Sequence, residues 1–253
     1  MPNTKAIVLF TQKVRLSRGN PNEPFTAIAW EDIDLLFSAM LTDLVEQITK
    51  IQSVDIFVSV NSTDLQDDFL IPFQRKVSIL EHSSLSLPQR ISSTMNNIFE
   101  NGYHRLILFM QHYPLIGVEF FNSVFNQLNY EEECLILGTS KSERVSLFGV
   151  KSNYADWFDT GRNATPDKTD SSYIETDYIL KKACTNDIMI FNTHNIPSVD
   201  NGYDLEKLKR NIEHSMTTVG FFAKHTYEMF KFIENKYFSK KRKDEDWDTR
   251  RYI

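Results

Sequence analysis

Short apolar runs alternate along this chain with longer amphipathic stretches. Several of the short runs are nearly continuous in Val, Ile, Leu and Phe, which is typical of strands that are covered on both faces of a sheet. This pattern predicts seven strands, at residues 6–10, 54–60, 77–80, 106–110, 135–137, 146–150 and 188–191.

The stretches between these strands repeat apolar residues at the period of a helix. In residues 32–51, the apolar set that includes Ile33, Leu36, Met40 and Leu44 falls on one side of a helix. Similar patterns predict helices at 87–99, 118–128 and 173–183. A long helical stretch is predicted after Asp200, with Gly220 as the expected point of division.

Strands that alternate with helices indicate βαβ units and a mostly parallel sheet. We therefore expect an α/β fold with three layers (α/β/α), built on a mainly parallel mixed sheet. Residues 1–208 are predicted to form the main domain, 209–238 a C-terminal helical extension of it, and 239–253 a charged tail. Ligands of such sheets bind beyond the carboxyl ends of the strands, so the ends at Phe10, Val60 and Met110 are expected to share one edge.

Composition and charge narrow the setting of the protein. The chain has 253 residues and a formal net charge of −6, which argues against nucleic acid as a partner. No apolar run is long enough to span a bilayer, and no signal-peptide hydrophobic region follows the first residues. The two cysteines, Cys134 and Cys184, have no pairing or metal-binding spacing, so each is expected to be a small core residue in a reducing compartment. The expected location is the cytoplasm.

The loop after the first predicted strand carries three cations, Lys13, Arg15 and Arg18. Cations at the carboxyl end of a strand could hold a diphosphate through charge-assisted hydrogen bonds. The alternative is an ordinary solvated loop. No glycine-rich phosphate cradle follows, so the sequence contains neither a P-loop nor a dinucleotide fingerprint.

Two further positions carry candidate chemistry. His112 follows a predicted strand and could serve as a metal ligand or a base, although a hydrogen-bonded loop residue is the commoner role. Asp200 precedes a predicted helix, where it could coordinate a hard cation or cap the helix.

Several segments, in this order, carry a resemblance to a known family. They are a strand followed by Lys13, Arg15 and Arg18, a helix with Asp43 near its centre, the Leu-Pro-Gln-Arg-Ile segment that contains Arg90, the run 99–108, and the segment 198–205 with Asp200 and Asp204. Over residues 5–208 they resemble a bacterial family of glycosyltransferase-like proteins. These proteins have the A-type nucleotide-diphospho-sugar transferase fold and are related to molybdenum-cofactor guanylyltransferases.

The chain departs from the pattern of this family at positions that matter for chemistry. His112 stands where the family has a presumed metal-binding aspartate, and Ser198 replaces another aspartate. The segment 142–145 replaces an Asp-Gly-Gly-Tyr stretch, so that bulky Arg144 lies where glycine would admit a sugar. Gly149 still matches.

The resemblance implies a nucleotide or nucleotide-sugar ligand, with Lys13, Arg15, Arg18 and Arg90 as binding residues. It also implies a metal site at His112 and Asp200. Because imidazole suits softer metals than Mg²⁺, the expected cation is Mn²⁺ or Zn²⁺. Alternatively, the three loop cations supply the positive charge without a metal.

Two functional hypotheses therefore remain open from the sequence. The first is an active glycosyltransferase-like or nucleotidyltransferase-like enzyme. The second is a catalytically degenerate protein that keeps the fold as a non-catalytic nucleotide- or partner-binding module. No catalytic residue is assigned under either hypothesis.

Overall fold

A computed structural model gives the fold of the chain and describes residues 4–11, 24–62, 77–83, 85–110, 112–158, 173–215 and 223–238. The chain forms two compact units. The first comprises Met1–Gln12, Val45–His112 and Ile116–Ser198, and the second comprises Lys13–Leu44, Tyr113–Leu115 and Val199–Ile253. The predicted boundaries at 208 and 238 remain predictions.

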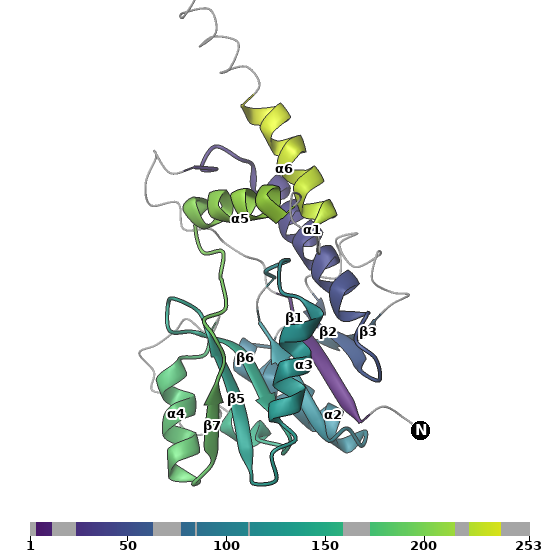
Figure 1. The fold of residues 1–253 in the computed structure, drawn as a ribbon, viewed down its shortest axis with the longest axis vertical. Coiled ribbons are helices and arrows are strands. Elements are labelled where there is room, and N and C mark those ends of the chain that lie inside the picture. The colour runs from purple at the N-terminus through teal and green to yellow at the C-terminus, as the bar shows by residue number, and fades with distance from the viewer. Residues whose placement is uncertain are drawn as a thin grey trace, which may run out of the picture. The chain divides into compact units, whose positions relative to one another are not determined.

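One mixed sheet forms the centre of the first unit, with the strand order β3-β2-β1-β4-β6-β5-β7 (Figure 1). β6 runs antiparallel to both of its neighbours, and the other strand pairs are parallel. The sheet is therefore mainly parallel, as predicted, and it contains all seven predicted strands. Their bounds are Lys5–Phe10 for β1, Asp55–Asn61 for β2, Ser78–His82 for β3, Arg105–Phe109 for β4, Cys134–Thr139 for β5, Val145–Val150 for β6 and Met189–Asn192 for β7.

The register of the parallel strands brings their carboxyl ends to one edge. Phe10 of β1 pairs with Ser59 of β2, and Leu9 pairs with Phe109 of β4. On the other side of β2, Asn61 pairs with His82, the last residue of β3. The prediction that these strands end at one shared edge is confirmed.

Helices cover both faces of this sheet. Alternate residues of a strand point to opposite faces, and in β4 Leu106 and Leu108 pack in the core with α2 (Leu87–Glu100), η3 (Ala155–Trp157) and α4 (Thr176–Thr185). Phe109 points the other way, toward Phe121 of α3 (Val118–Gln127), at 5.4 Å between ring centroids. The first unit therefore has the three layers that the pattern predicted.

The second unit contains most of α1 (Trp30–Ile48), together with α5 (Gly202–Ser215) and α6 (Lys224–Tyr237). The apolar sides of α5 and α6 are buried, including Leu208, Ile212 and Phe230 as predicted. The Phe25 ring lies 5.9 Å from that of Phe230. Gly220, the expected point of division, and the predicted tail lie outside the described residues.

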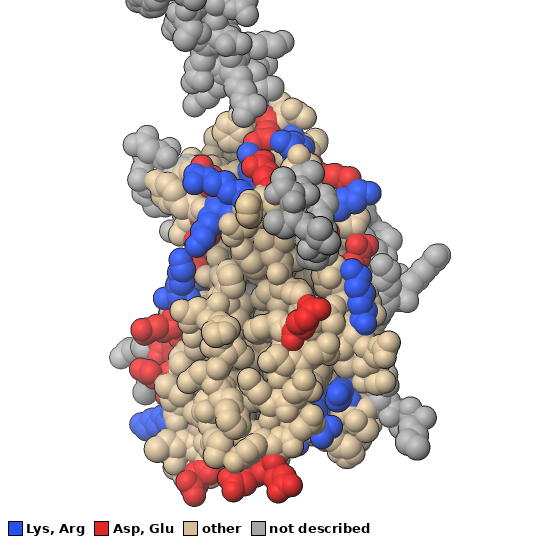
Figure 2. Space-filling model, in the orientation of Figure 1, with Lys and Arg blue, Asp and Glu red and all other residues tan. Residues whose placement is uncertain are grey.

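Burial corrects one expectation about the cysteines. Cys134 is buried, but Cys184 is exposed, because it lies on the outer side of α4 while Ile179 and Ala183 face the core. Among the described residues, no helix combines the length and the apolarity that crossing a bilayer requires. On the face shown in Figure 2, charged side chains lie mostly along the margins, and the middle carries few of them.

Candidate functional site

Six buried polar side chains gather at the carboxyl edge of the parallel strands, entirely within the first unit. They come from the ends of β1, β2 and β3, from the residues after β4, and from α2. We call them the carboxyl-edge cluster: Thr11, Ser59, His82, Arg90, Thr94 and His112. Buried polar groups need hydrogen-bond partners, and the cluster supplies them largely from within.

Arg90 is the centre of this cluster. A capping box between Ser86 and Gln89 starts α2, and Arg90 is the fourth residue of the helix. The guanidinium group donates to the carbonyl oxygen of Thr11 at 2.9 Å, to the hydroxyl of Ser59 at 3.1 Å and to the Ser59 carbonyl oxygen. It lies 5.4 Å from the centre of the Phe10 ring. Arg90 thus joins the ends of β1 and β2 and carries a buried positive charge to the candidate site.

His112 lies next to this charge and is only 6% exposed. Its Nε2 lies 3.2 Å from the carbonyl oxygen of Phe10. A carbonyl oxygen only accepts hydrogen bonds, so we infer that Nε2 carries the proton. The pKa of His112 is lowered to about 4, mainly by burial; the Phe10 hydrogen bond acts against this shift and the charge of Arg90 adds to it. The imidazole is therefore neutral at pH 7.

A second histidine lies at the end of β3. His82 Nε2 is 3.4 Å from the hydroxyl oxygen of Thr94, and burial followed by the charge of Arg90 lowers the pKa of His82. Ser62 donates to the His82 carbonyl oxygen at 2.8 Å. The side-chain oxygen of Asn61 is buried and has no hydrogen-bond partner among the described residues.

The predicted site residues have different outcomes. Arg90 and His112 lie in the cluster, whereas Lys13, Arg15 and Arg18 lie outside the described residues. Their role in binding a ligand stays a prediction. Sequence reasoning missed Ser59, His82 and Thr94, although a polar residue near the carboxyl end of an apolar strand was a usable signal.

Asp200 belongs to the second unit and lies just before α5. Its backbone N–H donates to the Asp204 carboxylate at 3.1 Å, and the Asp204 N–H donates to the Asn201 side chain at 3.0 Å. Asn201 therefore has the capping role that the sequence analysis considered for Asp200. The joint metal site of His112 and Asp200 stays a prediction, since the two residues belong to different units.

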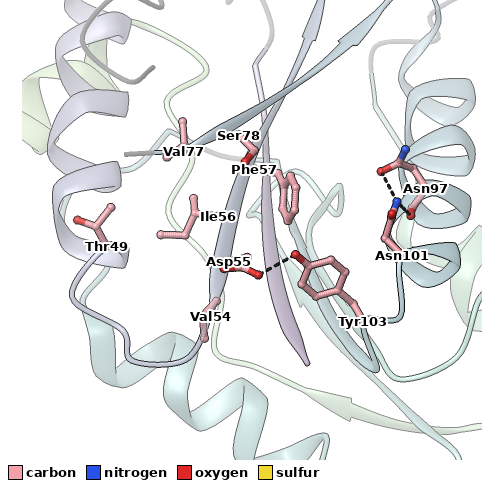
Figure 3. A pocket seen from close by; sticks show the side chains of 10 residues that line it. All are labelled: Thr49, Val54, Asp55, Ile56, Phe57, Val77, Ser78, Asn97, Asn101 and Tyr103. Atoms are coloured by element: carbon pink, nitrogen blue, oxygen red, sulfur yellow. Dashed lines mark hydrogen bonds between the residues drawn. The ribbon is translucent and has the colours of Figure 1, made fainter. Parts of the chain in front are cut away.

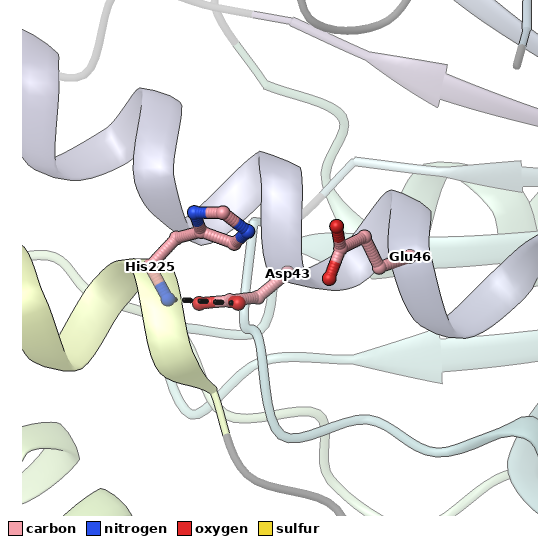
Figure 4. A group of neighbouring side chains, drawn as sticks. All are labelled: Asp43, Glu46 and His225. Carbon is pink, nitrogen blue, oxygen red and sulfur yellow. Dashed lines mark hydrogen bonds between the residues drawn. The ribbon is translucent and has the colours of Figure 1, made fainter.

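One group of side chains has the spacing of metal ligands in the described part of the chain. Figure 4 shows Asp43 and Glu46 one turn apart on α1, with His225 at the start of α6. Their ligand atoms lie within 4.8 Å of one another. Asp43 accepts hydrogen bonds from the N–H groups of His225 and Thr226 at 3.1 and 2.8 Å, and from the Thr226 hydroxyl at 2.6 Å.

These bonds explain Asp43 without a metal. The carboxylate satisfies N–H groups in the first turn of α6, which have no partner within the helix. Burial raises the pKa of Asp43 despite these hydrogen bonds. We therefore interpret Asp43 as a helix cap supplied from α1.

The segment 142–145, where the resemblance placed a sugar, is held by the protein itself. The Arg144 guanidinium carbon lies 4.3 Å from the centre of the Tyr173 ring, and the Arg144 carbonyl oxygen accepts the Ser140 N–H at 2.9 Å. Gly149 is a packing position, because a Cβ there would lie 3.1 Å from Ile136 and Val124. The match at Gly149 therefore has a structural explanation.

Comparisons with known proteins support the fold. No protein-family model matches the chain, and no curated protein matches it. Solved structures do match. A protein of Desulfovibrio desulfuricans G20, provisionally assigned as a nucleotide-diphospho-sugar transferase, superposes with a TM-score of 0.71 at 16% identity, over 92% of this chain and 96% of its own.

Two nucleotidyltransferases are also similar. A CMP:2-keto-3-deoxy-manno-octonic acid synthetase in complex with CTP has a TM-score of 0.52 at 10% identity, over 83% of this chain and 99% of its own. A cytidylyltransferase of Leptospira borgpetersenii serovar Hardjo-bovis has a TM-score of 0.51 at 12% identity, over 93% and 95%. The chain therefore has a nucleotide-diphospho-sugar transferase-like fold, as the resemblance implied.

Proposed function

We propose that this protein binds a nucleotide or a nucleotide-diphospho-sugar at the carboxyl ends of β1, β2 and β4, and that it has lost Mg²⁺-dependent transfer. Parallel α/β sheets bind ligands beyond these strand ends. The fold shared with a nucleotide-diphospho-sugar transferase and a CTP-bound synthetase supports the class of ligand. A shared fold does not establish activity. The proposed loss of Mg²⁺-dependent transfer is based instead on the chemistry of a single residue.

That residue is His112. Transfer from a nucleotide-diphospho-sugar needs positive charge on the leaving diphosphate, and Mg²⁺ prefers carboxylate oxygens as ligands. The resemblance implies an aspartate at this position. His112 is instead a neutral, buried imidazole whose Nε2 is 3.2 Å from the Phe10 carbonyl oxygen. It offers Mg²⁺ neither a negative charge nor an oxygen.

The proposal assigns the phosphate side of the ligand to cations of the chain. Lys13, Arg15 and Arg18 follow β1 directly in the sequence and contact the diphosphate. Arg90 contributes its charge from beneath the strand ends, where its guanidinium group donates to Thr11 and Ser59. Binding of phosphate therefore does not require a metal ion.

Any cation in the site is proposed to be Mn²⁺ or Zn²⁺ rather than Mg²⁺, with His112 and Asp200 as ligands. Neutral imidazole suits these softer metals, and His112 is neutral at pH 7. A bound ion would neutralise phosphate charge. A neutral, buried His112 would equally fit a module that binds only a protein partner. Nucleotide binding distinguishes the two hypotheses, because such a module binds no nucleotide. A cytoplasmic location stays a prediction.

The decisive experiment compares the wild type with His112→Asp. Hydrolysis of several nucleotide-sugars is measured with Mg²⁺, Mn²⁺ and Zn²⁺, and nucleotide binding is measured by calorimetry. We expect both proteins to bind nucleotide, the wild type to show no Mg²⁺-dependent turnover, and turnover to appear in His112→Asp. His82→Asp, which places a carboxylate at the end of β3 on the same edge of the sheet, is the matched control.

Two results would contradict the proposal. Robust Mg²⁺-dependent turnover by the wild type would show that catalysis is intact. The absence of binding for every nucleotide and nucleotide-sugar would leave the fold as a partner-binding module.

A further inference from the structure

A pocket lies at the edge of the sheet opposite the carboxyl-edge cluster, entirely within the first unit. It has a volume of about 860 Å³ and surrounds the starts of β2 and β3 (Figure 3). Asp55 in the pocket and Ser59 in the carboxyl-edge cluster are four residues apart on β2, which at about 3.3 Å per residue is roughly 13 Å along the strand. The residues that line it are Thr49, Val54, Asp55, Ile56, Phe57, Val77, Ser78, Asn97, Asn101 and Tyr103.

A carboxylate and a phenol meet on one side of this pocket. Tyr103 donates its hydroxyl hydrogen to Asp55 Oδ2 at 2.7 Å. Burial, and then the hydrogen bond to Asp55, raises the pKa of Tyr103 to about 12. Tyr103 therefore remains a neutral phenol throughout the physiological range and holds the Asp55 carboxylate in a fixed direction.

Two carboxamides stand across from this pair on α2. Asn101 donates through Nδ2 to the Asn97 carbonyl oxygen at 2.7 Å, and both side chains are exposed (Figure 3). A carboxamide has two donor hydrogens and an acceptor oxygen. The pocket thus presents donors and acceptors from several directions.

Aromatic rings lie beside these polar groups. The rings of Phe57 and Tyr103 meet edge to face, with centroids 5.7 Å apart and planes at 89°. Both pack against the core of the first unit and yet remain only partly buried. Each therefore leaves apolar ring surface at the pocket.

Among the residues that the structure describes, the lining contains no Lys or Arg and one carboxylate. An anionic ligand such as a nucleotide gains no charge pairing here. A ligand with many hydroxyl groups and an apolar C–H face fits better, since it can bond to the carboxylate and the amides and lie against the aromatic rings. The volume lies within the range of small-molecule sites.

We propose that this pocket binds a neutral saccharide. Its hydroxyl groups bond to Asp55 and to the amides of Asn97 and Asn101, while a C–H face of the sugar ring packs on Phe57 and Tyr103. This site is separate from the proposed nucleotide site, so either one can be right without the other.

The test is saturation-transfer difference NMR on the full chain with glucose, galactose, mannose, N-acetylglucosamine and maltotriose at millimolar concentration. We expect saturation transfer from the protein to at least one saccharide, undiminished by UDP. Comparing maltotriose with the monosaccharides distinguishes binding of an oligosaccharide from binding of a single sugar. Tyr103→Phe keeps the ring and removes only the hydroxyl, and Asp55→Ala removes the carboxylate.

Each of these two variants should bind about tenfold more weakly, the effect of losing one hydrogen bond to a charged or fixed group. The matched controls, Tyr130→Phe and Asp156→Ala, change exposed residues outside the pocket and should bind as the wild type does. Absence of saturation transfer to any of the saccharides would overturn the proposal. Equal binding by all four variants would do so as well.

Discussion

Arg90 shows how one side chain can hold two strand ends in place. Its guanidinium group donates to Thr11 and Ser59, on neighbouring strands, and is 2% exposed. Arg90→Met keeps the length of the side chain but removes these donors, which leaves the Thr11 carbonyl oxygen short of a partner. We expect the free energy of unfolding to fall by about 3 kcal/mol.

Urea unfolding measures this loss. The control is Arg210→Ala, because the Arg210 side chain is 70% exposed, and its effect should stay within about 0.5 kcal/mol. Equal effects of the two variants would contradict the structural role of Arg90.

His112 predicts a pH dependence of stability. Its pKa is lowered to about 4 in the folded protein, from an ordinary value of 6.5. The unfolded chain therefore takes up a proton first as the pH falls from 6.5 toward 4, and the folded state loses stability over this window. The full contribution of His112 is present above pH 6.5 and is lost as the pH falls to 4.

The measurement compares the wild type with His112→Gln, which cannot titrate, in metal-free buffer. Between pH 7 and pH 5, the free energy of unfolding of the wild type should fall by about 2 kcal/mol more than that of the variant. His82 also titrates with a lowered pKa, but it is common to both proteins and cancels. Parallel pH curves for the two proteins would show that His112 is not buried in solution.

The site could be predicted from the sequence only in part, and particular residues show why. His112 was found from its position after a predicted strand, and Arg90 through the resemblance. Ser59, His82 and Thr94 have no periodicity of their own and come together only through strand register and the packing of α2. What a polar residue contacts across two strands is not encoded in its neighbours along the chain.

At the scale of elements, the sequence was more informative. Near-continuous apolar runs predicted all seven strands because both faces of the sheet are covered. The ends were less certain. Asp55 and Asn61 bound β2 although both are polar, and Asn201, not Asp200, caps α5. Ends depend on hydrogen bonding to neighbouring segments, which a hydrophobic pattern does not record.

Gly138 supports a prediction about how closely β5 approaches its neighbours. A Cβ at Gly138 would lie 2.6 Å from Ile196 Cδ1 and 2.9 Å from Leu147 Cβ, beside a register shift in the β5–β6 pairing. Gly138→Ala should therefore lower the free energy of unfolding by about 2 kcal/mol. Gly149→Ala, whose nearest contacts are at 3.1 Å, should cost less. Thermal or urea unfolding gives the order, and a reversed order would contradict the packing described.

The cap that α1 supplies to α6 gives a second prediction at this scale. Asp43 accepts from two N–H groups and one hydroxyl of His225 and Thr226. Asp43→Ala leaves these donors without their acceptor and should cost about 2 kcal/mol. Asp43→Asn keeps one acceptor oxygen and should cost less. The free energy of unfolding of both variants measures the difference, and equal losses would mean that packing, not capping, explains Asp43.

At the scale of the whole molecule, the two edges of the sheet have opposite chemistry. The carboxyl edge has a buried guanidinium group and two histidines, and the sequence continues from β1 into Lys13, Arg15 and Arg18. The described lining of the pocket at the amino edge has a carboxylate, a phenol and two carboxamides, with no Lys or Arg among these residues. Anions are thus favoured at the carboxyl edge and neutral polar ligands at the amino edge.

Nucleotide binding at the carboxyl edge should therefore be electrostatic and sensitive to salt. A nucleoside diphosphate at a concentration about 100 times its dissociation constant should stabilise the folded protein by about 2.7 kcal/mol. Added NaCl should weaken the binding, because salt screens exposed charge pairs.

Replacing Arg15 and Arg18 together by Ala should lower diphosphate affinity about tenfold and flatten the salt dependence, with little effect on a nucleoside. The double variant Lys50→Ala and Lys181→Ala removes the same charge from exposed positions away from the carboxyl edge and should bind like the wild type. Equal weakening in both double variants would indicate a general effect of net charge, and equal loss for diphosphate and nucleoside would remove Arg15 and Arg18 from the phosphate site.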